Sequence, residues 1–274
     1  MVSRPRVALT IAGSDSSGGA GVVADLKTFS ARGVWGAVAV TAVTAQNTLG
    51  VQTLELVSPE LVRAQMASVA SDLDVRAAKT GMLGSADNVT AVAETVAELG
   101  IGPLVVDPVL VSGHGNRLVP GGPTAEADLV AAVLRLLLPL AAVVTPNLLE
   151  ASVLTGVPVL TREDMVVAGR MLAERGPGLV LVKGGHLGGD SSPDCLVGED
   201  LPPQWLEEPR VESRHTHGTG CVLSAAICAG LATGLEPSDA VRGAKAFVTR
   251  AVARGVDLGA GIGPVDPSAG RLDG

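Results

Sequence analysis

Short apolar runs alternate with longer amphipathic stretches along the whole chain. The runs that predict strands are Arg6–Ala12, Gly36–Ala45, Val51–Val57, Val75–Lys79, Leu104–Asp107, Ala142–Thr145 and Leu179–Lys183. The stretches that predict helices are Gly19–Arg32, Glu60–Ser71, Ser85–Leu99, Thr124–Leu138, Thr161–Glu174, His217–Ala232 and Pro237–Arg254. Strands that alternate with helices of this length indicate an α/β fold, with a mainly parallel sheet covered on both faces.

Local signals mark the ends of several of these helices. Pro59 is placed to begin a helix, Ser85 is an N-cap candidate, and Gly100 follows the end of that helix. Thr161-x-x-Asp164 has nearly the form of a capping box. Because no interior stretch has the composition of a linker and no repeat is present, we expect one domain over residues 1–274. We expect its Gly- and Pro-rich tail, residues 258–274, to be loosely held.

Composition restricts the classes of protein to which the chain can belong. Hydrophobic residues make up 47% and charged residues 18%, which excludes a disordered chain. The aromatic residues are Phe29, Trp35, Trp205 and Phe247, and there is no Tyr. The core must therefore be built from Ala, Val and Leu, and a protein that stacks nucleic-acid bases on aromatic rings is disfavoured.

Charge and targeting signals favour a cytoplasmic protein that binds neither nucleic acid nor membranes. The net charge is −8, which argues against both of these anionic partners. The most apolar stretch, Leu129–Val144, contains Arg135 and Pro139 and is too short to span a bilayer. The N-terminus has no signal-peptide pattern, and three cysteines do not form a secreted disulfide framework.

A glycine-rich loop follows the first predicted strand, where α/β proteins bind their ligands. Gly19–Ala24 matches the G-x-G-x-x-A dinucleotide fingerprint. That fingerprint needs an acidic residue at the end of the next strand, which here ends in Gln46-Asn47, so the match is weak. Asp25, one turn into the helix, is either a ligand-facing carboxylate or a solvated residue.

Polar residues also follow the other predicted strands. The Gln46 carboxamide suits the edge of a heterocycle or a turn, and Asp107 suits a metal or a cap. Asn147 and Glu150 form a capping-box pattern, and the alternative is that they hold hydrated Mg²⁺. Lys183, followed by two glycines, is either a phosphate contact or a solvated side chain.

The segment from His215 to Cys221 carries the sharpest chemical signal. Gly218, Thr219 and Gly220 place free N–H groups at the start of a helix, which predicts an anion site. Cys221 lies in the first turn, where the helix dipole would lower its pKa, so it is a candidate base or nucleophile; the alternative is a small packing residue. The His215-x-His217 pair is a weak metal signal. A P-loop kinase is excluded, because the G-x-x-x-x-G-K-[ST] pattern is missing.

Taken together, the motifs resemble those of the hydroxymethylpyrimidine/phosphomethylpyrimidine kinases of thiamine biosynthesis, which are ribokinase-like proteins. The matching segments follow the family order over nearly the whole chain. They are Ala8–Asp15, Gly18–Gly21, Ala24–Thr28, Thr44–Thr48, Lys79–Leu83, Val106–Val109, Thr145–Asn147 with Glu150, Lys183–His186 and His215–Cys221. The resemblance implies a three-layer α/β/α fold with a mainly parallel central sheet. It also suggests a homodimer.

The resemblance implies phosphorylation of 4-amino-5-hydroxymethyl-2-methylpyrimidine and then of its monophosphate. The implied cofactors are ATP and Mg²⁺, and a monovalent cation is a further candidate. By matching motif, Gln46 would pair with the aminopyrimidine, in a pocket lined by Gly13, Asp25, Met82 and Val109. Cys221 would be the base, and Gly218, Thr219 and Gly220 would bind the transferred phosphoryl group. Asp107, Asn147 and Glu150 would position Mg²⁺ and triphosphate, with Asp107 and Glu150 as metal ligands, and Lys183 would contact ATP.

One loop departs from the family pattern. The loop Leu110–Asn116 lacks the lysine that many relatives carry there, so His114 is the candidate contact for the phosphate of the second-step substrate.

Two other functions compete with this kinase activity. The first is a pyridoxal or pyridoxine kinase on the same scaffold, against which the Gln46 carboxamide argues. The second is a non-catalytic pyrimidine-binding sensor, which would not need the Gly218–Cys221 loop.

Overall fold

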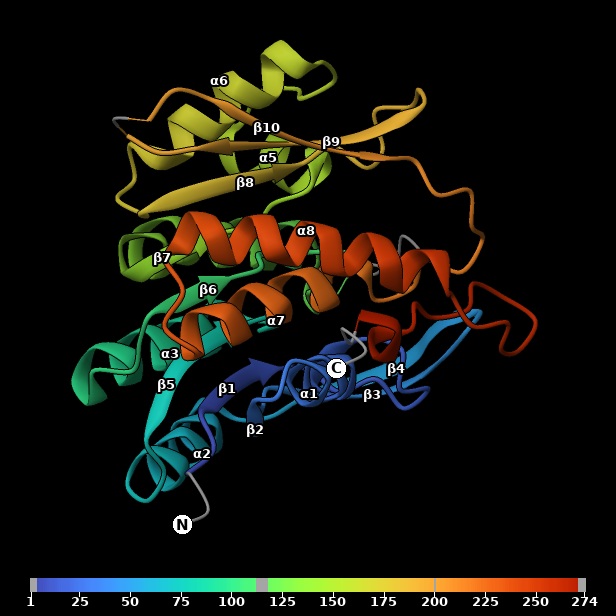
Figure 1. The fold of residues 1–274 in the computed structure, drawn as a ribbon. Coiled ribbons are helices and arrows are strands. Elements are labelled where there is room, and N and C mark those ends of the chain that lie inside the picture. The colour runs from blue at the N-terminus through green and yellow to red at the C-terminus, as the bar shows by residue number, and fades with distance from the viewer. Residues whose placement is uncertain (1–3, 112–117, 200, 271–274) are drawn as a thin grey trace.

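Within residues 4–111, 118–199 and 201–270, which the computed structural model describes, the central feature is an eight-stranded sheet (Figure 1). Its order is β10-β9-β8-β7-β6-β5-β1-β2. Its strands are β1 (Val7–Ala12), β2 (Trp35–Val40), β5 (Val75–Thr80), β6 (Leu104–Val106), β7 (Ala141–Val144), β8 (Leu179–Lys183), β9 (Ser191–Val197) and β10 (Gln204–Pro209). The six strands from β2 to β8 in this order run parallel to one another. Strand β9 is antiparallel to β8, and β10 is antiparallel to β9. The predicted α/β fold with a mainly parallel sheet is confirmed.

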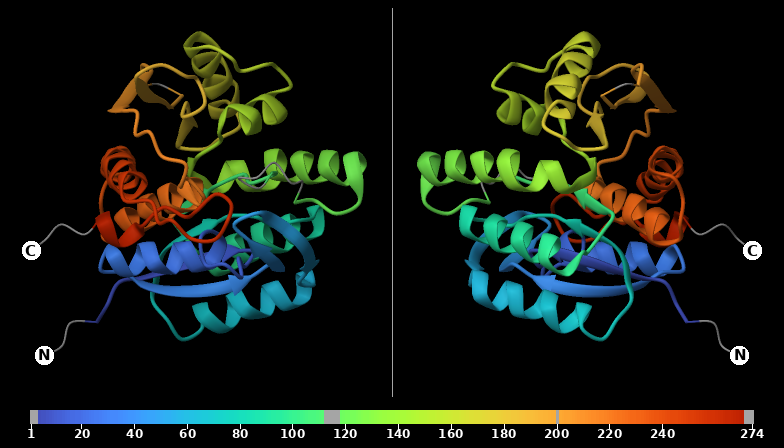
Figure 2. Two further views of the ribbon diagram at one scale, coloured as in Figure 1. Left: turned by 90° about the vertical axis from the view of Figure 1, so that its right-hand side faces the viewer. Right: turned by 90° about the vertical axis from the view of Figure 1, so that its left-hand side faces the viewer.

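Helices cover both faces of this sheet (Figure 2). One face carries α1 (Gly21–Ala31), α7 (Thr219–Ala232) and α8 (Pro237–Ala253), and their buried residues form one apolar cluster with the sheet. The other face carries α2 (Pro59–Ala70), α3 (Ala86–Leu99), α4 (Gly122–Ala132), α5 (Leu148–Thr155) and α6 (Arg162–Ala173), which share a second cluster. Val, Leu and Ala dominate both clusters, as the composition predicts.

Helix ends follow the capping signals of the sequence. The Ser85 side chain accepts a hydrogen bond from the Asn88 N–H at the start of α3, and Gly100 ends that helix with a left-handed φ of 62°. Both halves of the Thr161–Asp164 capping box are formed on α6. These caps satisfy backbone groups that a helix end would otherwise leave without a partner.

The predicted strand Gly36–Ala45 is divided at Thr41, which lies between β2 and β3 (Ala42–Asn47). The Thr41 hydroxyl donates to the carbonyl of Met82 at 2.6 Å and its N–H donates to the carbonyl of Ala12 at 3.0 Å. Beyond this point the chain leaves the main sheet, and β3 pairs antiparallel with β4 (Gly50–Leu56). The resulting β3–β4 hairpin lies beyond the carboxyl ends of β1 and β2 (Figure 1).

Two further parts of the chain differ from the prediction. Strands β9 and β10 were not predicted, because their polar residues and Pro193 obscure the pattern of a sheet-edge hairpin. The predicted helix Thr124–Leu138 is α-helical only to Ala132 and continues as a π-helical turn, Val133–Leu137, before a 3₁₀ turn that contains Pro139.

The expectation of a loosely held tail is wrong as far as residue 270. The Val265 N–H donates to the carbonyl of His217 at 3.0 Å, and the Ile262 N–H donates to the carbonyl of Thr48 at 2.9 Å. Val265 is 3% exposed, and a 3₁₀ turn, Pro267–Gly270, packs on α8. The Gly- and Pro-rich composition therefore reflects tight turns along the surface of the domain.

Candidate functional site

Asp107 lies at the centre of the carboxyl-terminal edge of the sheet, directly after β6. Its Oδ1 is 3.1 Å from Lys183 Nζ and accepts a hydrogen bond from the Thr145 hydroxyl at 3.2 Å. Its Oδ2 accepts from the Ser224 hydroxyl of α7 at 3.2 Å. Strands β6, β7 and β8 and helix α7 thus converge on this one carboxylate.

Glu150 lies on the other side of Lys183, at the start of α5. Its Oε2 is 3.8 Å from Lys183 Nζ and accepts from the Asn147 N–H at 2.8 Å, while Asn147 Oδ1 accepts from the Glu150 N–H at 2.9 Å. The capping-box interpretation of these two residues is therefore confirmed. The structure also brings Glu150 and Asp107 to the same lysine. The alternative that Asn147 and Glu150 hold hydrated Mg²⁺ is therefore compatible with their role as a cap.

The two carboxyl groups beside Lys183 have pKa values shifted in opposite directions. Burial would raise the pKa of Asp107, but the ammonium groups of Lys183 and Lys79 outweigh it and hold that pKa below its ordinary value. Burial raises the pKa of Glu150 to about 7. The Lys183 ammonium opposes this rise, and the Asp107 carboxylate adds to it. The site thus contains more buried carboxylate than its lysine neutralises, which fits the charge of a divalent cation.

The N-terminus of α7 faces this charged group. Gly218 is the N-cap with a φ of 83°, and the Thr219 hydroxyl donates to the carbonyl of Thr216 at 2.7 Å. A Cβ atom added to Gly220 would lie 3.4 Å from Lys183 Nζ and 3.8 Å from Asp107 Oδ2. The N–H groups of the first turn and the Lys183 ammonium therefore border one space, an arrangement that suits an anion.

Cys221 differs from its expected chemistry. Burial raises the pKa of its thiol to about 12; the ammonium group of Lys79 opposes this shift, and the carboxylates of Asp25 and Asp107 add to it. The net shift in the ligand-free protein is thus opposite to the lowering expected from the helix dipole, because burial is the largest effect on this thiol. The thiol is therefore protonated at neutral pH.

Asp25 is fully buried beneath the glycine-rich loop. Its carboxylate lies 3.0 Å from Nζ of Lys79, which is also fully buried, and accepts from the Thr10 hydroxyl at 2.6 Å. The alternative of a solvated helix residue is wrong. A direct contact between Asp25 and a ligand would require one of these bonds to be exchanged.

Apolar residues of the predicted pocket lie together under the β3–β4 hairpin. Met82 forms a small cluster with Ala42 and Leu118, against which Val109 packs. A Cβ atom on Gly13 would lie 3.2 Å from Met82 Sδ, so the backbone of this loop and the Met82 side chain are in direct contact. The structure therefore brings Gly13, Met82 and Val109 to one place.

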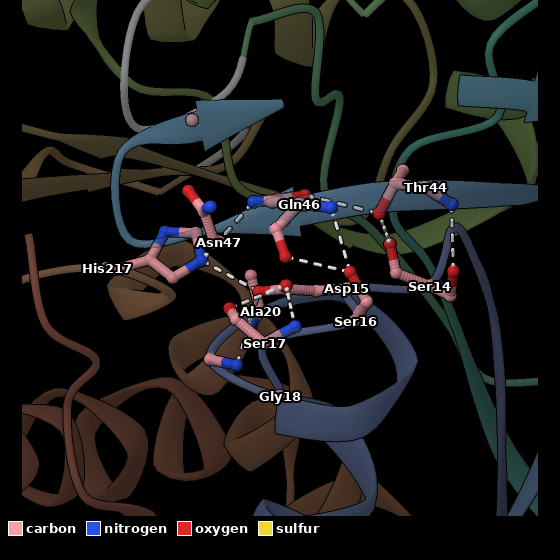
Figure 3. Close-up of polar contacts among 12 residues, drawn as sticks. Ser14, Asp15, Ser16, Ser17, Gly18, Ala20, Thr44, Gln46, Asn47 and His217 are labelled. Carbon is pink, nitrogen blue, oxygen red and sulfur yellow. Dashed lines mark hydrogen bonds and ion pairs between the residues drawn. The ribbon is translucent and has the colours of Figure 1, made fainter. Parts of the chain in front are cut away.

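Gln46 connects this pocket to two residues that the sequence analysis did not select (Figure 3). Its Nε2 lies 3.4 Å from His217 Nε2, and His217 Nε2 lies 2.8 Å from Asp15 Oδ2. The Asp15 carboxylate also accepts three backbone N–H groups of its own loop. Asp15 and His217 are in motifs that the sequence analysis quoted, but no local pattern indicates that they meet.

Metal binding through the His215-x-His217 pair finds no support. His217 contacts Asp15, whereas His215 Nε2 lies 3.7 Å from Asp257. In the described part of the chain, no group of three or more His, Cys, Asp or Glu side chains is placed to hold a metal ion. His114 lies outside the described residues. Among the helices that are described, none has the length and apolar character needed to cross a membrane.

Comparison with known proteins gives one consistent family. Residues 15–266 match the family described as phosphomethylpyrimidine kinase. A hydroxymethylpyrimidine/phosphomethylpyrimidine kinase of Streptomyces coelicolor is 49% identical over 265 residues, which is 96% of this chain and 94% of the relative. A protein of the same name from Rhizobium meliloti is 48% identical and covers 94% of this chain and 96% of its own length.

One solved structure of similar fold contains a bound nucleotide. It is a pyridoxal kinase of Bacillus subtilis in complex with ADP, with a TM-score of 0.90 and 37% identity. The similarity covers 98% of this chain and all of the other, 100%.

Proposed function

This chain belongs to the phosphomethylpyrimidine kinase family, and from that membership we propose that it catalyses two successive phosphoryl transfers from ATP. The first acceptor is 4-amino-5-hydroxymethyl-2-methylpyrimidine and the second is its monophosphate, in the biosynthesis of thiamine. The fold is the ribokinase-like α/β/α architecture that it shares with the pyridoxal kinase.

The observation that supports phosphoryl transfer best is the space between the α7 N-terminus, Lys183 and Asp107. In our proposal, N–H groups of Gly218, Thr219 and Gly220 hold the transferred phosphoryl group, and Lys183 contacts the phosphates of ATP. Phosphoryl transfer needs positioning and charge stabilisation more than covalent chemistry, which suits these groups. The Thr219 N–H donates to the carbonyl of Thr216 at 3.3 Å in the ligand-free protein, so it would exchange this bond for one to the phosphoryl group.

Cys221 is the proposed base that accepts the proton of the substrate hydroxyl. Its high pKa in the ligand-free protein comes from burial and from two carboxylates, with Lys79 acting in the opposite direction. A cation bound at Asp107 would cancel one of the charges that raise the pKa. A larger fraction of the thiol would then be ionised at neutral pH, and so able to accept a proton, when the ATP complex is assembled.

Asp107 and Glu150 are the residues that would hold the Mg²⁺ that accompanies ATP. The excess of buried carboxylate around Lys183 supports this position. Mg²⁺ usually takes only one or two protein carboxylates besides phosphate oxygens and water, so a larger cluster is not needed. The bound ion would neutralise charge on the transferring group. Asn147 holds Glu150 in place through the capping box, and a monovalent cation is a further proposed cofactor.

Recognition of the pyrimidine is assigned to Gln46, with Gly13, Met82 and Val109 as the lining of the pocket. The aminopyrimidine edge presents a donor beside an acceptor, which a carboxamide matches with two hydrogen bonds. Because Asp25 is used by Lys79 and Thr10, its proposed contact with the substrate would replace one of these bonds. His114 remains the proposed contact for the phosphate of the second substrate.

We also propose a cytoplasmic homodimer. Large apolar side chains are exposed on β2 and on the β3–β4 hairpin: Trp35 is 61%, Val43 57% and Leu49 66% exposed. Such residues suit an interface between copies. Light scattering of the purified protein tests this, since a monomeric mass would contradict the homodimer.

The decisive experiment is an ATP assay with both acceptors in turn. We expect release of ADP with 4-amino-5-hydroxymethyl-2-methylpyrimidine and again with its monophosphate. If neither compound stimulates ADP release, the proposed function is wrong. If the compounds bind without turnover, the chain is a sensor.

Pyridoxal is the second candidate acceptor, because the pyridoxal kinase of Bacillus subtilis has a TM-score of 0.90 with this chain. The values of kcat/KM for pyridoxal and for the aminopyrimidine decide between the two. We expect the aminopyrimidine to be preferred, because pyridoxal lacks the amino group that Gln46 would recognise.

A further inference from the structure

The C-terminal tail, residues 261–265, contacts the turn of the β3–β4 hairpin (Figure 1). The Ile262 N–H donates to the carbonyl of Thr48 at 2.9 Å, and the Gly261 N–H donates to the Thr48 hydroxyl at 3.2 Å. A Cβ atom on Gly261 would lie 1.8 Å from the Thr48 carbonyl oxygen, so the two backbones meet too closely for any other residue. Thr48 directly follows β3, the strand that carries Gln46.

The same tail also pairs with the segment that leads into α7. The His217 N–H donates to the carbonyl of Gly263 at 3.1 Å, and the Val265 N–H donates to the carbonyl of His217 at 3.0 Å. The two segments run parallel at this bridge. Val265 is buried in the apolar cluster that includes α7 and α8. Because His217 directly precedes Gly218, the tail reaches the start of the proposed phosphoryl site.

The glycine-rich loop packs against His217 as well (Figure 3). His217 Nε2 lies 2.8 Å from Asp15 Oδ2, and these two side chains are 3% and 1% exposed. The same carboxylate oxygen accepts from the N–H groups of Gly19 and Ala20. A Cβ atom on Gly19 would lie 2.6 Å from His217 Cδ2 and 2.9 Å from Pro264 Cβ. The loop, His217 and the tail are therefore in close contact with one another.

The β3–β4 hairpin depends on contacts of this kind. Within the described residues, β3 and β4 form a two-stranded sheet of their own, and an isolated hairpin is at best marginally stable in water. Ser14 and Ser16 bind the backbone of β3 at Thr44 and Gln46, whereas the tail binds the turn at Thr48. The tail thus connects the strand that carries Gln46 to the start of α7.

Resting on the proposed function, we infer that residues 261–265 and His217 are positioning residues. They hold the acceptor-binding hairpin and the phosphoryl-binding start of α7 in a fixed relative position, and they act through Thr48 and Gly218. Reacting atoms must approach to about 3–3.5 Å, and a displacement of about 1 Å can lower the rate by about 10²-fold. A tail that sets this approach therefore controls turnover without touching either substrate.

The first test is Gly261→Ala in the full chain, with steady-state kinetics for ATP and the aminopyrimidine. The added methyl group displaces the tail from Thr48, so we expect kcat to fall about tenfold or more. KM for ATP should stay within about twofold, because the groups proposed to serve ATP, Lys183 and Glu150, belong to β8 and α5. A tail that only stabilised the fold would lower the melting temperature without this selective loss of kcat.

Further variants test the single contacts. His217→Leu removes the bond to Asp15 and should lower kcat about tenfold. His217→Gln keeps an N–H donor near the position of Nε2 and should recover kcat to within about threefold of the wild type. Thr48→Val removes only the hydroxyl that accepts from Gly261, so a smaller fall of about two- to fivefold is expected.

Gly36→Ala is the matched control for Gly261→Ala. Its Cβ atom would lie 2.4 Å from Leu26 Cδ2 and 2.9 Å from Phe29 Cδ2, so it also disturbs close packing, but between β2 and α1. We expect a lower melting temperature and a kcat near the wild-type value. Thermal unfolding of every variant gives the loss of stability with which the change in kcat is compared.

The outcomes separate this inference from the proposed function. A wild type that releases no ADP with either pyrimidine overturns the proposed function and this inference with it. An active wild type, with kcat unchanged in folded Gly261→Ala and His217→Leu, overturns this inference alone. So does an equal fall of kcat in Gly36→Ala, since the effect would then follow stability. If Gly261→Ala does not fold, an unchanged kcat in Thr48→Val overturns the inference in its place.

Discussion

Cys221 shows how strongly the chemistry of one residue depends on its surroundings. Its place in the first turn of α7 predicts an activated thiol, yet burial raises its pKa to about 12. Lys79, Asp25 and Asp107 all act on it, and they come from β5, α1 and the end of β6. The net effect of these charges could not be summed from the sequence, because it depends on distances between separate elements.

Replacing Cys221 should affect turnover more than binding. In Cys221→Ala we expect kcat to fall by about 10²–10⁴-fold with a smaller change in KM, as is typical when a base is lost. Cys228→Ala is the matched control, because Cys228 is fully buried on the same helix and should leave kcat near the wild-type value. Steady-state kinetics with the aminopyrimidine measure both, and an unchanged kcat in Cys221→Ala would remove this residue from the mechanism.

The raised pKa of Cys221 also predicts slow alkylation of the ligand-free protein. Because the thiol form dominates below pH 12, the thiolate fraction should rise about tenfold for each pH unit between 7 and 9. Peptide mass spectrometry after exposure to iodoacetamide measures the rate at this position. Extending the series to about pH 10.5 decides the point, because a rate that levels off near pH 10 is what a thiol of ordinary pKa would give and would show that the pKa is not raised.

At the scale of elements, α5 and α6 carry the same capping box in different surroundings. Asn147 and Glu150 close the box of α5 beside Lys183, whereas Thr161 and Asp164 close that of α6 on the exposed surface. A capping motif that the sequence explains structurally can therefore also hold a functional carboxylate.

Breaking the two boxes should separate stability from function. Asn147→Ala and Thr161→Ala should each reduce the free energy of unfolding by about 1 kcal/mol, as cap removal does. Only Asn147→Ala is expected to lower kcat/KM, because it loosens the first turn of α5, which carries Glu150, even though the backbone N–H of Asn147 that binds the Glu150 carboxylate is kept. Urea denaturation and ATP-dependent kinetics test the pair, and equal activities would show that the α5 cap does not position the site.

The two ends of α7 offer a second comparison, between Gly218 and Gly234. Both have left-handed φ values, 83° and 91°. A Cβ atom on Gly218 would come within 1.9 Å of the carbonyl oxygen of Gly19, whereas one on Gly234 meets nothing within 4 Å.

Alanine at these glycines should therefore have different effects. Both variants should lose about 1–2 kcal/mol of stability from backbone strain. Only Gly218→Ala should also push α7 away from the glycine-rich loop and lower kcat/KM by more than tenfold. Kinetics and thermal unfolding of the two proteins measure this difference, and equal activity in both would show that the close approach is unnecessary.

At the scale of the whole molecule, a buried ion pair joins layers that are distant in sequence. Asp25 on α1 and Lys79 on β5 have no exposed side-chain surface, and Thr10 on β1 completes their bonding. Both charged groups also act on the pKa of Cys221. Removing one partner leaves an uncompensated charge in the interior.

Lys79→Met should accordingly destabilise the protein by about 3–5 kcal/mol. The exposed pair Arg63–Glu94 has a shorter distance of 2.7 Å, but its loss in Arg63→Ala should cost at most about 1 kcal/mol because solvent screens it. The double variant Asp25→Leu/Lys79→Met should recover part of the loss. Chemical denaturation tests the set, and a small effect of Lys79→Met would contradict a buried charged pair.

Local information in the chain was sufficient for most of the helices and parallel strands. Periodicity and caps such as Ser85 and Thr161 act over a few residues, so they can be recognised without the fold. The ordered glycine-rich motifs were likewise sufficient to indicate the family. Strands β9 and β10 were missed because an edge hairpin is stabilised by pairing across the sheet rather than by its own pattern.

Only the tertiary structure decided the chemistry between the motifs. His217 and Asp15 are 202 positions apart, and only folding brings His217 Nε2 within 2.8 Å of Asp15 Oδ2. Burial of Cys221 and the shared contacts of Lys183 with Asp107 and Glu150 arise in the same way. The sequence by itself determined which groups are available. Their protonation and orientation depend on burial and on partners brought together through space, which only folding specifies.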